Sequence, residues 1–186
     1  MLSEKDISKK TERGVRMYRK NDLIVYGSTG VCRITDIAPL PHMPDCHKEY
    51  YTLIPLFSPV AEIIHVSVQT CACIRPLITA AQARMYLESL AELPATPYHS
   101  HDPKQTVAHY TEILNTHDCM QYLQMVKSIY MKSAENARIG KKISQTEQRY
   151  LKQAEHISFG ELAAALDKTL EEIRTQVQEA LRNVCA

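Results

Sequence analysis

The residues in this sequence that most clearly could bind a ligand are basic ones, which are concentrated in its second half. Positions 104–152 hold eight lysines and arginines against four acidic residues, whereas the whole chain has 22 basic and 21 acidic residues. Lys141 and Lys142 precede a predicted helix start, and Arg149 and Lys152 follow three residues apart on one helix face. Because a helix N-terminus also favours anions, these four could bind nucleic-acid phosphates. The alternative is a solvated, charged helix face.

A second candidate lies in the first half, in the run Ile63-Ile64-His65-Val66. The run has the β-branched character of a strand. If the strand lies at a sheet edge, another protein could bind it by strand addition. His65 could then change its charge near about pH 6–7. The alternative is an ordinary strand that carries a partly exposed histidine.

Catalytic and metal-binding patterns have little support. His42, Asp45, Cys46 and His47 are metal-ligating residue types in one loop, but their spacing fits no zinc motif. The six cysteines include no C-x-x-C pair, and the chain has no nucleophile elbow, P-loop or G-x-G-x-x-G run. We therefore predict no enzyme activity, no catalytic residue, no metal and no cofactor. A metal-dependent hydrolase that uses the loop around Cys46 is the weakest alternative.

The elements that must position these residues change in type along the chain. Strand patterns occur at 22–26, 31–37, 49–54, 63–68 and, more weakly, 71–74. Antiparallel strands this short predict a small bent sheet or barrel.

After Pro76 the periodicity becomes helical. The sequence predicts helices over 80–90, 104–116 and 118–137, with Thr79 and Asp118 as caps. Ser144 and Glu147 form a capping box that starts a further helix, and an apolar stripe from Leu170 to Val184 indicates the last one. The expected fold class is α+β, with a sheet followed by an all-α helical bundle.

These patterns also predict the organisation of the chain. We expect a disordered tail over 1–16, a β module over 17–77 and a helical domain over 78–186. No apolar run approaches the ~20 residues needed to cross a bilayer, and the N-terminal segment has no signal-like apolar region. We therefore expect a cytoplasmic protein with no membrane partner. It would be a monomer or a weak homodimer, because the last stripe could bury within the chain or against a second copy.

Several motifs together resemble those of CarD-like transcription regulators, whose N-terminal module is shared with transcription-repair coupling factors. In the strand half these are YRKNDLIVYGSTGV at 18–31, Ile34, Ile37 and EYYTL at 49–53. In the helical half they are ISQTE at 143–147, Leu151, Ala154 and GELA at 160–163. The similarity covers about Met17 to Asp167.

The resemblance implies a Tudor-like β module that binds the RNA polymerase β subunit through Ile63, Ile64, His65 and Val66. It also implies a helical domain that contacts promoter DNA at the upstream edge of the bubble. Lys141, Lys142, Arg149 and Lys152 would meet the phosphate backbone there, beside the minor groove. Such proteins alter the stability of the open complex and do not read a DNA sequence.

Three features depart from the family pattern. Asn21-Asp22 replaces the usual Gly-Asp, and the following turn lacks the frequent Pro and His. His65 stands where an arginine often contacts polymerase. Thr106 aligns with the tryptophan that many members press against the minor groove, and this chain has no tryptophan. Threonine is too small for such a wedge, so DNA contact should depend on backbone electrostatics. A protein-interaction module of the same fold without DNA binding is the main alternative.

Overall fold

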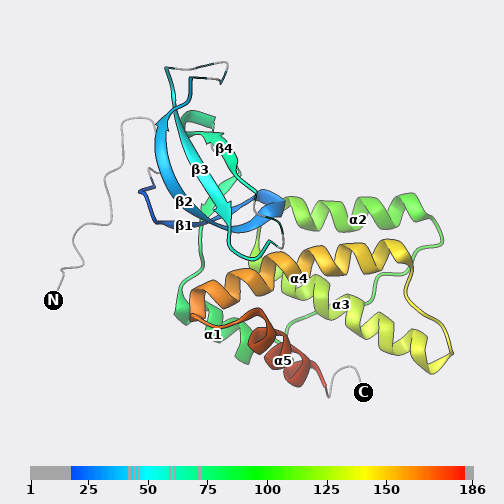
Figure 1. Cartoon of the computed structure of the whole chain (residues 1–186). Coiled ribbons are helices and arrows are strands. Elements are labelled where there is room, and N and C mark those ends of the chain that lie inside the picture. Colours follow the sequence, from blue (N-terminus) through cyan, green and yellow to red (C-terminus); the bar gives the residue numbers. More distant parts are fainter. Residues whose placement is uncertain are drawn as a thin grey trace.

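The computed structural model describes residues 18–182, except positions 42, 44, 46, 59, 61, 71 and 72. The polar segment 1–16 lies outside them, so its predicted disorder stays a prediction. The first half forms one antiparallel sheet in the order β4-β3-β2-β1-β5 (Figure 1). Its strands are β1 (Leu23–Tyr26), β2 (Gly30–Pro39), β3 (Glu49–Pro55), β4 (Ile64–Ser67) and β5 (Ile74–Pro76), and two short 3₁₀ helices are η2 (Gly27–Thr29) and η3 (Val68–Thr70).

The sheet is bent but open, which corrects the barrel alternative. β4 pairs only with β3, and β5 pairs only with β1, so the described strands leave two free edges. The fifth strand is confirmed over Ile74–Pro76, whereas positions 71 and 72 of the predicted strand lie outside the described residues.

A bulge in β2 changes which residues face the core of the sheet. Regular alternation would place Ile34 and Ile37 on opposite faces. The register of β2 against β3 shifts between Ile34 and Asp36, so one extra residue is accommodated there. Ile37 therefore packs against the same cluster as Ile34, which also contains the buried Ile24, Tyr51 and Leu53.

Five helices follow, and their predicted caps are confirmed. They are α1 (Ala80–Glu88), α2 (Pro103–Asn115), α3 (Cys119–Arg138), α4 (Gln145–Leu166) and α5 (Leu170–Leu181). Thr79 and Ser144 each complete a capping box, and Asp118 accepts a hydrogen bond from the backbone N–H of Gln121. Thr169 forms a further capping box before α5 that the sequence analysis missed. Within the described residues, no helix is both long and apolar enough to span a membrane.

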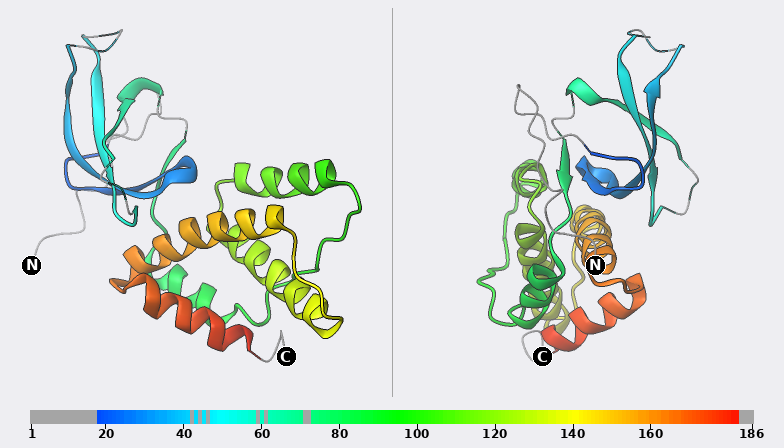
Figure 2. Two further views of the ribbon diagram at one scale, coloured as in Figure 1. Left: turned by 45° about the vertical axis from the view of Figure 1, so that its right-hand side comes forward. Right: turned by 90° about the vertical axis from the view of Figure 1, so that its left-hand side faces the viewer.

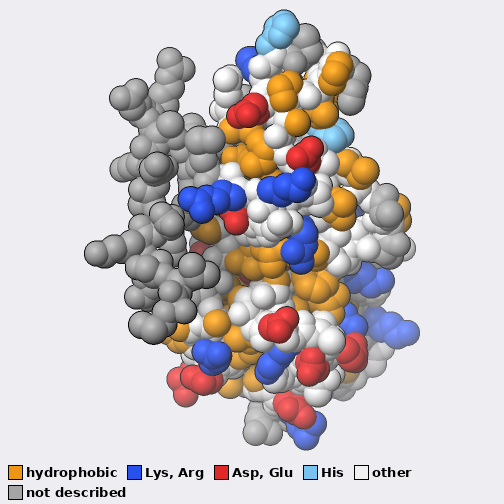
Figure 3. All heavy atoms as spheres, turned by 60° about the vertical axis from the view of Figure 1, so that its left-hand side comes forward, with side chains coloured by type: hydrophobic (Ala, Val, Ile, Leu, Met, Phe, Trp, Pro, Cys, Tyr) orange, Lys and Arg blue, Asp and Glu red, His pale blue; other side chains and the backbone are white. Residues whose placement is uncertain are grey.

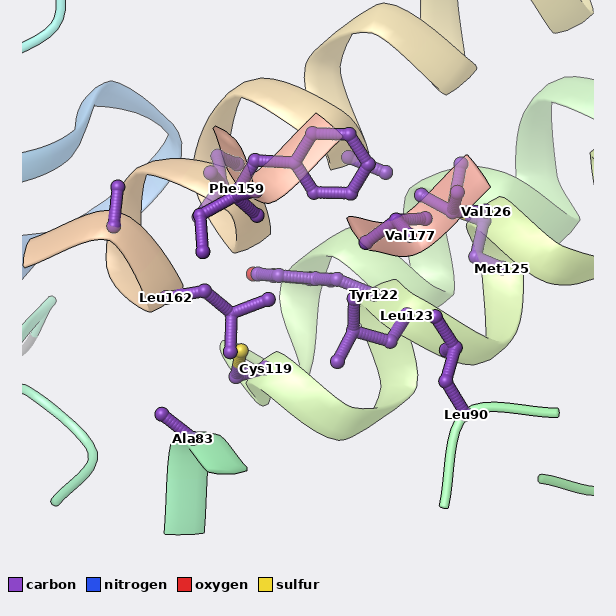
Figure 4. Packing of buried hydrophobic residues seen from close by; sticks show 14 of the residues in the cluster. Ala83, Leu90, Cys119, Tyr122, Leu123, Met125, Val126, Phe159, Leu162 and Val177 are labelled. Carbon is purple, nitrogen blue, oxygen red and sulfur yellow. The ribbon is translucent and has the colours of Figure 1, made fainter. Parts of the chain in front are cut away.

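The helices enclose one large apolar core. Figure 4 shows Phe159 and Leu162 of α4 directed toward Tyr122 and Leu123 of α3, with Val177 of α5 nearby. The apolar stripe of α5 thus buries within the chain: Ile173, Val177 and Leu181 are all buried. Val184, the last predicted member of the stripe, lies outside the described residues.

The sheet and the helices share this core. Val25 of β1 and Val31 of β2 belong to the same buried cluster as the helical residues. The left view of Figure 2 shows the sheet over the C-terminal half of α4, with the N-terminal ends of α2 and α4 and the C-terminal end of α3 directed away from it. The two halves therefore form one packed unit with a sheet end and a helical end.

Candidate protein and nucleic-acid interfaces

The sheet end carries an exposed apolar corner on the β3–β4 hairpin. Ile63 exposes 63% of its surface, Val60 67% and Ile54 39%. Ile63 directly precedes β4, and Leu53, next to Ile54, pairs with Ile64 across the hairpin. We call Ile54, Val60 and Ile63 the sheet corner. Ile54 and Ile63 flank the same strand pair and Val60 lies in the loop between them, and exposed apolar side chains on one hairpin are typical of a protein-binding surface.

β4 itself is an edge strand, as the proposed docking role requires. Its register pairs Tyr50 with Ser67 and Leu53 with Ile64, and no described strand lies on its other side. The backbone groups on an unpaired edge can bind an extended segment of another protein. The edge and the sheet corner thus offer backbone hydrogen bonds and apolar contact side by side.

The four predicted contact residues differ in how accessible they are. Ile64 and Val66 are half-buried and pack against the sheet core. His65 lies opposite Thr52 on β3, and its Nδ1 is 3.3 Å from the Thr52 hydroxyl. Ile63 therefore offers the largest apolar contact, while Ile64 and Val66 hold the edge strand in place.

The outer face of the sheet is not a uniformly basic surface. Figure 3 shows lysine and arginine side chains near its middle, with acidic and hydrophobic side chains among them. Lys20 and Asp36 form one exposed pair of opposite charge in the sheet half, with Nζ and Oδ1 3.5 Å apart. A face of mixed sign has no strong attraction for a nucleic-acid backbone.

Basic residues gather instead at the helical end, where the N-termini of α2 and α4 and the C-terminus of α3 lie (Figures 1 and 2). Six exposed cations belong to this basic end: Lys104, Arg138, Lys141, Lys142, Arg149 and Lys152. The four predicted phosphate-binding residues are therefore all exposed on neighbouring segments, the α3–α4 connection and the start of α4.

Two of the eight basic residues counted in the sequence do not contribute to this surface. Lys127 is only 4% exposed, and its Nζ donates to the carbonyls of Ala91 (2.6 Å) and Leu93 (2.8 Å). The Nζ of Lys132 donates to the carbonyl of Tyr98 (2.6 Å). Together with Ser128, which donates to the carbonyl of Thr96, they attach the Pro-rich loop to α3.

Lys132 also pairs with Glu147, the buried acid of the capping box. Its Nζ lies 2.5 Å from Oε1 of Glu147, and Ser144 donates to Oε2 from its backbone and its hydroxyl. Burial opposes the charged form of Glu147, but these donors outweigh it and hold its pKa below the usual value. An ionised Glu147 therefore holds the start of α4 against α3 next to the basic end.

The charges of the four predicted phosphate-binding side chains are not neutralised by acidic residues that the structure describes. Within the described part of the chain, Lys141, Lys142, Arg149 and Lys152 form no ion pair. The guanidinium of Arg149 lies 5.0 Å from the centre of the Tyr150 ring, which orients it without neutralising it. Four exposed cations around a helix N-terminus are suited to phosphate binding.

Thr106, the remaining predicted DNA contact, is placed differently. It lies in the first turn of α2, where it is buried and its hydroxyl donates to the carbonyl of Asp102. Its neighbour Val107 is exposed. At this position of the basic end, Val107 therefore offers more apolar surface to a ligand than Thr106 does.

A groove of about 640 Å³ separates η2 from the C-terminal half of α2. Its lining includes Cys73, His117 and hydroxyl or amide side chains such as Ser28 and Asn115. Cys73 is a free, exposed cysteine, and no hydrogen bond joins it to His117 among the described residues.

The described residues include no candidate metal site. Among them, no group of three or more histidine, cysteine or carboxylate side chains is arranged to hold a metal ion. Asp45 and His47 are exposed loop residues. His42 and Cys46, the other members of the loop considered above, lie outside the described residues, as does Cys71.

Sequence reasoning missed a contact that joins the sheet to the helices. Arg75 of β5 binds Glu161 of α4 through its two terminal guanidinium nitrogens, Nη1 and Nη2, and Glu161 also accepts from the backbone N–H of Ile78 at 3.1 Å. The two residues are 86 positions apart, so no local signal could reveal the pair.

No protein-family model matches the chain, and no curated protein matches it in sequence.

Proposed function

We propose that this protein is a cytoplasmic transcription regulator of the CarD type that links RNA polymerase to promoter DNA. The edge strand β4 and the sheet corner bind the polymerase β subunit, in the manner of a Tudor-like module. The basic end contacts the promoter backbone without reading its sequence and alters the stability of the open complex.

The observation that carries this proposal is the division of the surface between two ends of one packed unit. Of six exposed large hydrophobic side chains among the described residues, three form the sheet corner, and Val107 and Ile139 accompany the cations of the basic end. Because the sheet and the helices share a core, a partner held at the sheet end fixes the position of the basic end. Such a molecule is suited to hold a nucleic acid at a defined place on a large protein.

Polymerase binding can be tested with the full chain and purified polymerase β subunit in a calorimetric titration. The variants Val60→Glu and Ile63→Glu place charge on the sheet corner, and Met85→Glu does so on the exposed surface of α1. We expect the corner variants to weaken binding at least tenfold and Met85→Glu to leave it unchanged. Absence of micromolar binding by the parent chain would contradict this part of the proposal.

DNA binding can be tested by fluorescence anisotropy with a promoter duplex over a range of salt concentrations. If the basic end contacts about four phosphates, the slope of log affinity against log salt is about −3.6. The double variant Lys141→Ala, Lys142→Ala should flatten this slope by about two, while Arg84→Ala on α1 should not change it. Polymerase binding without salt-dependent DNA binding would favour the alternative of a pure protein-interaction module.

A further inference from the structure

The groove between η2 and the C-terminal half of α2 is built from both halves of the chain. Its lining comes from Tyr26 and η2 in the sheet half and from α2 and α4 in the helical half. Hydrogen bonds hold these walls together: the backbone N–H of Gly27 donates to the carbonyl of Cys73 at 3.0 Å, and the hydroxyls of Thr111 and Tyr150 lie 2.8 Å apart. The volume of about 640 Å³ lies within the range of about 300–1,000 Å³ that is typical of small-molecule sites.

The lining of this groove carries no charged side chain. None of the described residues that line it is a lysine, arginine, aspartate or glutamate, although these types make up 23% of the chain. A phosphate or carboxylate would therefore meet no side chain of opposite charge in the lining. Removing an ionised group from water without such a partner is unfavourable, so the groove favours an uncharged ligand.

Several polar side chains of the lining are not used within the protein. Among the described residues, no side-chain hydrogen bond is formed by Ser28, Asn115, His117 or Gln153. They come from η2, from α2 and the turn that follows it, and from α4. Hydroxyl and amide side chains both donate and accept hydrogen bonds, and an imidazole does so through its two nitrogens. The groove therefore combines donors and acceptors from separate parts of the chain.

We infer that this groove binds an uncharged, polyhydroxylated small molecule, either a saccharide or the sugar of a nucleoside. Each sugar hydroxyl both donates and accepts hydrogen bonds, which matches the side chains of the lining. An apolar ligand fits less well, because it would displace water from polar groups and leave them without a partner. The groove shares no described lining residue with the sheet corner or the basic end, so the inference does not depend on the proposed function.

The experiment uses the full chain, with glucose, maltose, adenosine and AMP as probes. Saturation-transfer NMR measures binding, and mass spectrometry measures how fast an alkylating reagent modifies Cys73, an exposed free cysteine of the lining. We expect at least one uncharged probe to bind and to slow the alkylation of Cys73. AMP should bind more weakly than adenosine, because its phosphate meets no cation in the lining.

Variants of the unused amides test whether the groove is the site. Asn115→Leu and Gln153→Leu each remove the donor and acceptor of one lining side chain at similar volume. Each should weaken binding about fivefold, the loss expected for one net hydrogen bond. Gln178→Leu makes the same change on an exposed position of α5 and should leave the affinity unchanged.

The outcomes either support the inference or overturn it. Binding of glucose or maltose that protects Cys73 would identify a saccharide site, and protection by adenosine alone would identify a nucleoside site. No binding by any of the three uncharged probes would overturn the inference, as would binding that neither protects Cys73 nor responds to Gln153→Leu. Tighter binding of AMP that is lost in the double variant Lys141→Ala, Lys142→Ala would place the ligand at the basic end instead.

Discussion

Arg75 and Glu161 join the sheet to the helices through a paired contact at the centre of the molecule. Nη2 of Arg75 donates to Oε2 of Glu161 at 2.6 Å, Nη1 donates to Oε1, and Glu161 is fully buried. Burial disfavours the guanidinium cation, but Glu161 outweighs this and the pKa of Arg75 is raised. The link fixes the last strand of the sheet on α4, the helix whose start carries part of the basic end.

Removing either partner should destabilise the fold strongly. We expect Glu161→Ala or Arg75→Ala to lower the free energy of unfolding by about 3 kcal/mol, because each leaves a desolvated charge without its partner. Urea denaturation measures this change. Arg174→Ala, which breaks the exposed pair of Arg174 with Glu171, is the control and should cost less than about 1 kcal/mol. Similar losses for the two pairs would show that Arg75 and Glu161 do not form a structural link.

The local features of this fold could be read from the sequence, whereas its long-range contacts could not. Thr79, Asp118 and Ser144 reveal helix starts because a cap acts within three residues. Lys127 and Lys132 looked like surface charges, because nothing near them in the sequence shows that the loop 91–98 folds back over α3. That the sheet is open could not be predicted from the sequence either, because the final strand, β5, pairs with β1 across about fifty residues.

The predicted interfaces also divide into features that local sequence reveals and features that depend on long-range packing. Arg149 and Lys152 share a face of α4 through their spacing, Lys141 and Lys142 lie in the connection before it, and the structure exposes all four at one end. The burial of Thr106 depends on how α2 lies against its neighbours, which alignment by spacing does not capture. The sheet corner was missed at Val60 and Ile54, because exposure of an apolar residue has no local signature.

The ion pair of Lys132 and Glu147 should make part of the free energy of unfolding depend on pH. The pKa of Glu147 is lower in the folded chain than its usual 4.5, so the ionised carboxylate stabilises the fold above that value. This contribution is lost as the pH falls through the folded-state pKa. Glu147→Gln should therefore be less stable than the parent at neutral pH, and the difference should shrink in acid.

Urea titrations at a series of pH values between about 7 and 3 measure this difference. Glu172→Gln is a useful comparison, because Glu172 caps α5 in the same way but is exposed. Among the described residues it forms no salt bridge with a lysine; hydrogen bonds from Thr169 lower its pKa, and the nearby charge of Lys168 only helps to do so. At neutral pH, Glu172→Gln should lower the free energy of unfolding by less than Glu147→Gln does. A pH-independent difference for Glu147→Gln would contradict an ionised, paired Glu147.

The buried Lys127 should control the order of the Pro-rich loop. Lys127→Met keeps the apolar stem but removes the donors to Ala91 and Leu93. We expect a loss of about 2 kcal/mol, since charged hydrogen bonds are lost and buried carbonyls are left without donors. Hydrogen exchange at backbone amides of residues 91–98 should accelerate more than exchange in α5. Uniform acceleration throughout the chain would instead indicate a global effect of the substitution.

Gly160 should set how closely the β3–β4 hairpin approaches α4. A Cβ at Gly160 would lie 3.0 Å from Cδ2 of Phe57, which is closer than ordinary contact. Gly160→Val should therefore cost about 1–3 kcal/mol through overpacking. Replacing Phe57 by Leu in the same chain should recover part of that loss, because the ring edge that clashes is removed. The coupling comes from a double-mutant cycle of unfolding free energies. Strictly additive losses would mean that Phe57 does not limit the approach at Gly160.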